Sequence, residues 1–495
     1  MADGPRKLVL CVIDAMASEM LERAIEAGTA PVLARLVRDG RYISDCVSAF
    51  PSVTPVCAAS IVTGVAQDEH RIPGMNWYMR EESRYVEYGS SFRAAQRFGF
   101  AQQLTDTIYN MNGAHLASGV PTVFETLDDA GVRTAGTTYL MYRGRFLHEP
   151  QRDNALSRVA ATMLRHPVMG PRELFYADVF SSRRTGCRSG LGMPGLRDRH
   201  SACVSSYLVE NDLFDFLLLS LPDNDWLSHK RGPEGQLQSL AQADLHLARV
   251  MNAAGGVDAF LARHAVVVMA DHSQAPVGSK VSLQEVLAPL GVRGPGRSRA
   301  GEEQLGARIA VCPSQRAAMV YALEPSGRDA MRASVAGRAL ATDGVDLVMW
   351  LERDADDGPR EGVIASAERG ELRFSPGGPT RDGRGAQWSL SGALAAIEAR
   401  VSDGVVDSAS YPDALARCWA AISAPSSGDV LISAAPGWEF TDWGGQAHVG
   451  GGSHGSLHAS DSLAPLILHG TAAAREPAQW AIRDVAALVR EHFGA

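Results

Sequence analysis

Lysine is almost missing from this sequence of 495 residues, which has only Lys7, Lys230 and Lys280 among its 47 basic residues. The other 44 are arginine, and 56 acidic residues give a net charge of −9. There is no basic block or stripe in the sequence, so nucleic acid is not a predicted partner through its charged backbone. An acidic chain repels anionic substrates at long range, so a phosphorylated substrate would require cations near its binding site.

Paired cysteine motifs and long apolar runs are also missing. The seven cysteines (positions 11, 46, 57, 187, 203, 312 and 418) include no CxxC pair. An odd number without regular spacing predicts reduced thiols and a cytoplasmic protein. The apolar run at residues 8–13 is too short for a signal peptide, and no run reaches about 18 residues, so we expect no transmembrane helix and no membrane partner.

Buried strands that alternate with helices are the main pattern that is present. Apolar runs typical of buried strands occupy residues 8–13, 214–221, 265–270 and 429–434. Helical patterns occupy residues 17–27, 31–39 and 233–254, with Pro31 and Gly40 at positions that favour a helix start and end. This alternation predicts an α/β fold with a mainly parallel sheet and helices on both faces. Ligands then bind beyond the carboxyl ends of the strands, where we expect the polar motifs to converge.

Residues 280–428 interrupt the alternation. The segment is rich in arginine, glycine and proline and has short strand patterns such as residues 317–323. We therefore predict a core formed by residues 1–279 and 429–495. The intervening residues 280–428 are predicted to form an inserted α+β region near the active site.

The first chemical motif combines Asp14, at the end of the first strand, with residues 50–64 (FPSVTPVCAASIVTG). Thr54 precedes Pro55 and small residues, which predicts a helix start at this position. A hydroxyl at the positive end of a helix dipole is well placed to attack phosphorus. Alternatively, Thr54 is an ordinary N-cap.

Three further motifs offer metal ligands. Asp225 and His229 share one face of a helical turn, although Asp223 competes for the same role. The remaining pairs lie farther along the chain: Asp271 and His272 directly follow a buried strand, and the glycine-rich GSHGSLH contains His454 and His458. Spacing alone does not choose between the last two histidines.

Taken in order, these motifs resemble those of the alkaline phosphatase superfamily, and within it the type I phosphodiesterase/nucleotide pyrophosphatase branch. The resemblance covers residues 7–280 and 428–470, and HRIPGMNWY (residues 70–78) is similar to the HGIxGNxxYD stretch of that branch. It implies a three-layer α/β/α core and two divalent metal ions, usually zinc. One metal would be bound by Asp14, Thr54, Asp271 and His272, and the other by Asp225, His229 and His454. The HxxGP sequence that starts at His229 selects Asp225 over Asp223.

The sequence departs from the family at the oxyanion donor. The family asparagine aligns with Met75, which leaves Asn76 as the candidate donor and Asn110 or Asn112 as substitutes.

Sulfatases of the superfamily use a cysteine-derived nucleophile in a CxPxR setting. The corresponding position is Thr54 here, so a sulfatase is disfavoured.

The predicted function is hydrolysis of a phosphodiester or pyrophosphate bond in a small organic or nucleotide-like substrate, through a phosphothreonine at Thr54. A phosphomonoesterase or phosphonate hydrolase is the alternative within enzymes, and a catalytically inactive binding protein is the alternative outside them. Lys280, eight residues after His272, is a candidate for binding the substrate phosphate because lysine is so rare in this chain. The sequence does not indicate an oligomeric state.

Overall fold

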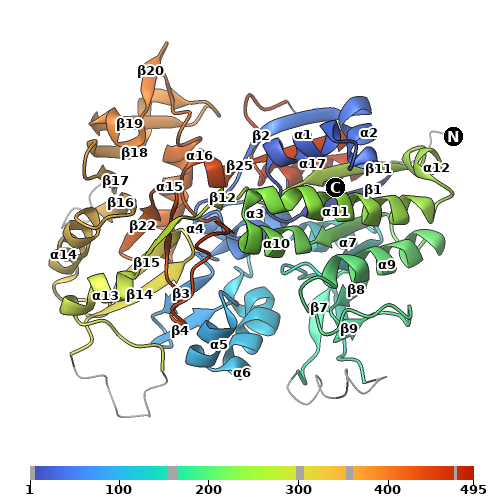
Figure 1. Cartoon of the computed structure of the whole chain (residues 1–495), viewed down its shortest axis with the longest axis horizontal. Coiled ribbons are helices and arrows are strands. Elements are labelled where there is room, and N and C mark those ends of the chain that lie inside the picture. The colour runs from blue at the N-terminus through green and yellow to red at the C-terminus, as the bar shows by residue number, and fades with distance from the viewer. Residues whose placement is uncertain (1–5, 153–157, 159–163, 297–305, 353–359, 473–475) are drawn as a thin grey trace.

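The computed structural model describes residues 6–152, 158, 164–296, 306–352, 360–472 and 476–495. Its first large sheet, called the central sheet below, has eight strands. From edge to edge the strands are β2 (Arg41–Val47), β25 (Leu463–His469), β11 (His264–Met269), β1 (Lys7–Ile13), β10 (Phe216–Leu221), β5 (Thr134–Thr137), β8 (Glu173–Tyr176) and β9 (Phe180–Ser181). Strands β1 and β11 are labelled on the right of Figure 1. The five strands from β11 to β8 are parallel, and the pairings of β25, β2 and β9 are antiparallel. The predicted mainly parallel sheet is therefore confirmed.

The register of the three central strands brings their carboxyl ends together. Val12 of β1 pairs with Ser220 of β10 on one side and with Met269 of β11 on the other. The polar residues that follow these strands therefore emerge at the same edge of the sheet, as the strand-end motifs predicted.

Both faces of the central sheet are covered by apolar side chains from helices. Leu8, Leu10 and Val12 of β1 belong to one hydrophobic cluster, and Val9, Cys11 and Ile13 belong to another. The first cluster includes residues of α3 (Thr54–Thr63), α7 (Val123–Asp129) and α17 (Asp484–Phe493). The second includes residues of α1 (Ser18–Glu26), α2 (Pro31–Asp39), α9 (Arg197–Glu210) and α11 (Gln236–Asn252). Because β1 is buried on both faces, its sequence is a continuous apolar run.

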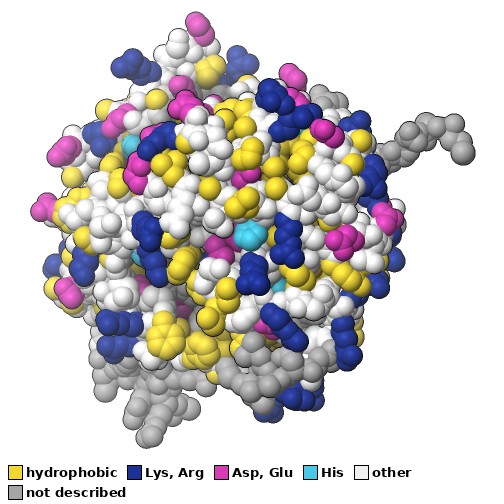
Figure 2. All heavy atoms as spheres, turned by 45° about the vertical axis from the view of Figure 1, so that its right-hand side comes forward, with side chains coloured by type: hydrophobic (Ala, Val, Ile, Leu, Met, Phe, Trp, Pro, Cys, Tyr) yellow, Lys and Arg dark blue, Asp and Glu magenta, His cyan; other side chains and the backbone are white. Residues whose placement is uncertain are grey.

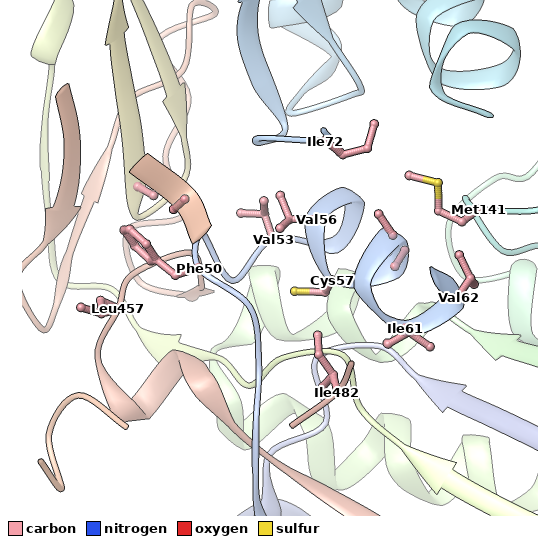
Figure 3. Packing of buried hydrophobic residues seen from close by; sticks show 14 of the residues in the cluster. Phe50, Val53, Val56, Cys57, Ile61, Val62, Ile72, Met141, Leu457 and Ile482 are labelled. Atoms are coloured by element: carbon pink, nitrogen blue, oxygen red, sulfur yellow. The ribbon is translucent and has the colours of Figure 1, made fainter. Parts of the chain in front are cut away.

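Helix α3 is fixed in position by packing on all sides. It begins at Thr54, has Pro55 in its first turn and ends at Gly64, whose φ of 81° is readily adopted only by glycine. Every residue from position 55 to 63 is buried. Figure 3 shows side chains of this helix pointing in several directions, against apolar residues from other segments that include Ile72, Met141 and Ile482. A helix packed in this way holds its first residue at a defined place.

A second, nine-stranded sheet is built mainly from the region predicted as an insertion. Its order is β14 (Ile309–Ser314), β15 (Ala317–Ala322), β22 (Val430–Ala434), β16 (Val345–Glu352), β17 (Glu361–Ser366), β18 (Gly370–Asp382), β21 (Val405–Asp407) and β20 (Arg400–Ser402), with β19 (Gln387–Gly392) paired to β18. Strand β22 was expected in the core, but it pairs with β15 and β16 of this sheet. The predicted boundary at residue 429 therefore divides the second sheet. A buried apolar run indicates a strand but does not identify its partners.

The two sheets share one hydrophobic cluster. It joins Leu10 of β1 and Val56 of α3 to Met319 of β15 and Leu431 of β22. Helices α14 (Arg328–Leu340) and α15 (Ala414–Ser423) also pack on strands of the second sheet. This common core holds the loops of the second sheet against the central one, which matters for the site described below.

Two of the cysteines form a disulfide, so the prediction of reduced thiols is wrong for Cys187 and Cys203. The fold brings their Cα atoms to 5.9 Å and so ties the loop before α9 to that helix. The other five cysteines are free and buried. Sequence spacing could not reveal this pair because the loop geometry brings it together. The cytoplasmic location loses this support and stays a prediction.

The surface in Figure 2 shows basic and acidic side chains interspersed with apolar ones on one face of the molecule. Within the described ranges, no helix combines the length and the apolar character needed to cross a bilayer.

Candidate active site

The predicted site residues come from loops and helix starts at the carboxyl edge of the central sheet. Asp14 directly follows β1, and Asp271 follows β11. Asp225 lies in α10 (Asp223–Arg231), which begins two residues after β10. Thr54 begins α3, and His454 follows the short strand β24 (Gly452–Ser453). Segments that are distant in sequence therefore meet at one end of the sheet.

Asp14, Asp271 and His272 form the first cluster, with one ligand atom of each within 4.8 Å of the others. The Nε2 atom of His272 lies 3.6 Å from Oδ1 of Asp14 and 3.5 Å from Oδ2 of Asp271. The hydroxyl of Thr54 lies 3.3 Å from the same nitrogen. Val53 takes the N-cap position of α3, so Thr54 is not an ordinary N-cap and its hydroxyl faces the cluster.

Asp225, His229 and His454 form the second cluster, again within 4.8 Å of one another. Oδ1 of Asp225 lies 3.2 Å from Nε2 of His229, one helical turn away, and 3.5 Å from Nε2 of His454. The two clusters are adjacent because the rings of His272 and His454 stack with their centroids 3.7 Å apart.

All three histidines are oriented by backbone carbonyl groups. The Nδ1 atoms of His229, His272 and His454 lie 2.8, 3.0 and 2.8 Å from the carbonyl oxygens of Gly452, Ser273 and Ser52. When Nδ1–H donates to a carbonyl, the neutral ring keeps a lone pair on Nε2, which is the atom that faces each cluster. This is the orientation that a metal-binding imidazole requires.

Buried negative charge is the main electrostatic feature of the site. Burial and the charges of Asp271 and Asp225 raise the pKa of Asp14 well above its usual range. Burial also opposes ionisation of Asp225, but His229 and His454 hold its pKa well below the usual range. Burial and the neighbouring His272 lower the pKa of His454 to about 4, so this ring is neutral and can act as a ligand at neutral pH.

Two carboxylate oxygens at the first cluster have no hydrogen-bond partner among the described residues. They are Oδ1 of Asp14 and Oδ2 of Asp271, both buried. Unpaired buried carboxylate oxygens are costly and call for a cation. With imidazole nitrogens beside them, these N and O donors fit two divalent cations, and zinc in particular accepts such mixed sets.

The structure places the residues that the sequence left open in different surroundings. Asp223 turns away from the clusters: it accepts hydrogen bonds from Nε of Arg197 at 2.9 Å and from backbone N–H groups of residues 195 and 198. His458 precedes α16 (Ala459–Ser462), and its Nδ1 lies 3.0 Å from the hydroxyl of Ser460. Asp225 and His454 are thus the residues that the fold brings into the clusters.

Lys280 and Lys230, two of the three lysines in the chain, lie on the exposed surface. Lys280 is an exposed residue of β13 (Ser279–Val281), which pairs with β23 (Trp438–Phe440). Lys230 places its ammonium 3.9 Å from the ring centroid of Trp226. Neither lines the cavity described below, so the geometry gives no support to Lys280 as a substrate ligand.

The asparagines considered as oxyanion donors have structural partners. The side-chain amide of Asn76 donates to the carbonyl of Val86 at 2.9 Å, across the hairpin formed by β3 (Asn76–Met79) and β4 (Arg84–Glu87). Asn110 donates to Asp106, and Asn112 donates to the carbonyl of Leu140. None of the three lines the cavity, although Met75 does.

A cavity of about 530 Å³ opens beside the first cluster, and sequence reasoning missed most of its wall. Asp14, Thr54, Asp225 and Asp271 line one end. The rest is mainly apolar or aromatic: Val12, Met75, Tyr88, Phe100, Leu104, Ile108, Tyr139, Leu140, Leu164, Tyr176, Val179 and Leu191. These residues come from segments without a recognisable motif, and only their placement in space shows that they share a wall.

Tyr139 and Arg197 are the polar wall residues of most interest. The hydroxyl of Tyr139 is buried without a hydrogen-bond partner. Burial and the charge of Asp271 raise its pKa well above the usual range, so it is a neutral hydrogen-bond donor. Arg197 is the cation of the described lining, and it is already paired with Asp223.

The turn that positions His454 is anchored to the second sheet by a buried ion pair. The guanidinium of Arg316, in the turn between β14 and β15, contacts the carboxylate of Asp461, and both side chains are fully buried. The backbone N–H of Arg316 also donates to the carbonyl of His454 at 3.0 Å. The second sheet therefore contributes directly to the geometry of the second cluster.

The mainly parallel α/β fold is consistent with the alkaline phosphatase superfamily. A family model for type I phosphodiesterases and nucleotide pyrophosphatases matches residues 8–457, so the chain belongs to this family, as its motifs predicted. Membership makes it a phosphoryl-transfer hydrolase in the broad sense. No curated protein gives a significant match.

Solved structures show the same fold at low sequence identity. Phosphonoacetate hydrolase from Sinorhizobium meliloti 1021, solved in complex with phosphonoformate, is 18% identical, with a TM-score of 0.57 over 99% of this chain and 96% of that one. Murine ectonucleotide pyrophosphatase / phosphodiesterase 5 is 11% identical, with a TM-score of 0.58 over 99% of this chain and 95% of that one.

Proposed function

We propose that the protein hydrolyses a phosphodiester or pyrophosphate bond of a small organic phosphate, through a phosphothreonine at Thr54. One observation carries the proposal: the Thr54 hydroxyl lies 3.3 Å from His272, within the first cluster, and opens into the large cavity. Membership of the phosphodiesterase family and the helix-start position of Thr54 support it further.

In this proposal the site residues bind the metal ions, and Thr54 also attacks phosphorus. Asp14, Thr54, Asp271 and His272 would hold one divalent cation, and Asp225, His229 and His454 a second, both most simply zinc. Bound cations supply Lewis acidity toward the phosphoryl and ester oxygens and favour the ionised hydroxyl.

Thr54 attacks phosphorus as the bond from phosphorus to the leaving oxygen breaks, and the hydroxyl proton passes through water to that oxygen, which departs as an alcohol or a phosphate. Water then hydrolyses the phosphothreonine. The dipole of α3 favours the negative charge that builds up beside its first residue.

Tyr139 replaces the asparagine donor in this proposal. Its hydroxyl is unpartnered and lines the same cavity as Thr54, Asp14 and Asp271. A donor of this kind stabilises a phosphoryl oxygen more in the transition state than in the ground state, because negative charge increases there.

The cavity favours a diester over a monoester. A diester has a second organic group that needs space beyond the reacting phosphorus, and the cavity provides it. A monoester has more charge on phosphorus and only one organic group, the leaving group, so it gains less from an apolar wall than a diester does. Phosphomonoester hydrolysis and phosphonate hydrolysis are therefore the alternative functions.

The test is a comparison of zinc-supplemented turnover of p-nitrophenyl phosphate, bis-p-nitrophenyl phosphate and the p-nitrophenyl ester of thymidine monophosphate. We expect turnover of the diesters to exceed that of the monoester. Preference for the monoester would contradict the diesterase assignment. Lack of turnover with any substrate, in protein that binds zinc, would support a binding protein instead.

Thr54→Ala tests the nucleophile. Turnover should fall by several orders of magnitude because residual catalysis would lack the covalent step. Zinc content should fall little, since Asp14, Asp271 and His272 remain, and the circular dichroism spectrum should stay unchanged. Thr54→Ser keeps a hydroxyl and should retain measurable activity. Mass spectrometry of acid-quenched enzyme should find a phosphate on residue 54. Turnover by Thr54→Ala within about tenfold of wild type would exclude the nucleophile assignment.

A further inference from the structure

The cavity beside Thr54 has very little positive charge. Its described lining includes three carboxylates, all in the two clusters, and a single cation, Arg197. The Nε of Arg197 donates to Asp223 at 2.9 Å and its Nη2 donates to the carbonyl of Pro222 at 3.1 Å. The guanidinium is therefore already occupied by protein groups.

The rest of the wall is mainly apolar and includes residues of helices α6 (Phe100–Thr105) and η1 (Asp106–His115) and of the segments around residues 164–192. Phe100 and Leu191 are exposed although they are large and apolar, with 46% and 40% of their surface accessible. Both line the cavity. Their exposed surface would be removed from water by an apolar ligand, which stabilises the complex.

We infer that the cavity binds an uncharged aryl or alkyl group attached to the substrate phosphorus, so that the preferred substrate is a monoanionic phosphodiester with an apolar ester group. The inference rests on the proposed function, because the two clusters are what places phosphorus at the end of the cavity.

The charge of the organic group distinguishes this substrate class from pyrophosphates and from esters that carry a carboxylate. A pyrophosphate chain or a carboxylate on the organic group would bring a second anion into the cavity. Burying an unpaired charge costs far more than burying a neutral group, and Arg197 would have to give up Asp223 to compensate it. A neutral aryl group meets no such cost and gains contact with the apolar wall.

The first experiment keeps the leaving group constant and changes only the other ester. We compare kcat/KM for phenyl p-nitrophenyl phosphate with that for methyl p-nitrophenyl phosphate. The phenyl ester should be preferred by about tenfold or more, because burial of an aromatic ring contributes at least that factor. A ratio near one would overturn the inference.

Matched variants test whether the cavity wall binds the phenyl group. Phe100→Ser and Leu191→Asn should each lower the phenyl-to-methyl ratio by about threefold or more. Phe92→Ser and Met193→Ser remove apolar side chains that are 69% and 57% exposed but lie outside the cavity lining, and they should leave the ratio unchanged. Equal effects of the cavity variants and the controls would overturn the inference.

A binding measurement separates failure of this inference from failure of the proposed function. Calorimetry with zinc-loaded Thr54→Ala protein compares phenylphosphonate with phosphonoacetate, which has a carboxylate where the first has a ring. Binding of phenylphosphonate that is at least tenfold tighter supports the inference even if no ester is hydrolysed. Tighter binding of phosphonoacetate, or no binding of either, overturns it.

Discussion

Replacement of Arg316 by methionine should destabilise the protein strongly. Arg316 is fully buried, and its guanidinium contacts Asp461 and donates to the carbonyls of Trp438 and Ala435 at 3.0 and 3.1 Å. Methionine approximates its volume but removes the ion-pair partner of the buried Asp461 carboxylate. Removing one partner of a buried ion pair costs about 3–5 kcal/mol in the free energy of unfolding.

The structure places the expected loss at the lower end of this range, about 3 kcal/mol. Asp461 keeps two hydrogen bonds in the variant, from the backbone N–H of Ser456 at 2.8 Å and from the hydroxyl of Ser460 at 2.9 Å. These bonds offset part of the cost of the unpaired charge. Equilibrium urea unfolding, followed by both tryptophan fluorescence and circular dichroism, measures the loss, and coincident transitions would establish two-state behaviour.

A double variant and an exposed control test the reasoning. Arg316→Met/Asp461→Leu removes both charges and should regain most of the lost stability. Arg373→Met breaks contacts with Glu352 and Glu361, whose side chains are about one-third or more exposed, so it should cost less than about 1 kcal/mol. The explanation would be refuted if Arg316→Met cost no more than Arg373→Met, or if the double variant were less stable than the single one.

Three further predictions concern the site and its surroundings. Asp225→Asn should weaken zinc binding by about 100-fold or more, measured by competition with a chromophoric chelator, whereas Asp223→Asn should change it less than tenfold because Asp223 contacts Arg197 instead. Tyr139→Phe should lower kcat by about 10- to 100-fold with little change in KM, and an unchanged kcat would remove its hydroxyl from the mechanism. Burial raises the pKa of Glu87 from its usual 4.5 to about 7, so the folded state binds the proton more tightly than the unfolded state. Stability from this group is therefore greatest below pH 4.5 and is lost as the pH rises to about 7. Glu87→Gln should flatten the pH dependence of urea unfolding between those values, and an unaltered slope would contradict the shift.

Much of the central sheet could be predicted because its strands are buried on both faces. Such strands read as continuous apolar runs, and β1, β10 and β11 all lie within two residues of the predicted limits. The second sheet could not be placed in this way. Strand β22 has the same apolar character, yet it pairs with β15 and β16, and local sequence does not encode the choice of partner.

The site residues also differ in how far the local sequence predicts them. Asp225 and His229 are close in sequence, so helical periodicity was enough to predict that they share a face. His454 could be distinguished from His458 only after the turn held by Arg316 was placed. The cavity wall carries no motif, because apolar side chains such as Phe100 look like ordinary core or surface residues until the fold brings them beside Thr54.

The anchoring of His454 also makes the site an indicator of completed folding. A partly folded chain can form α10 and so present Asp225 and His229 together, since they are one turn apart. It cannot add His454, whose ring is oriented by Ser52, 402 residues earlier, and whose backbone is bound by the second sheet. Closing such long loops is slow and follows local structure. Tight metal binding at the second cluster should therefore appear only once both sheets have docked. Metal ions that bind the fully folded chain would in turn stabilise it relative to partly folded chains.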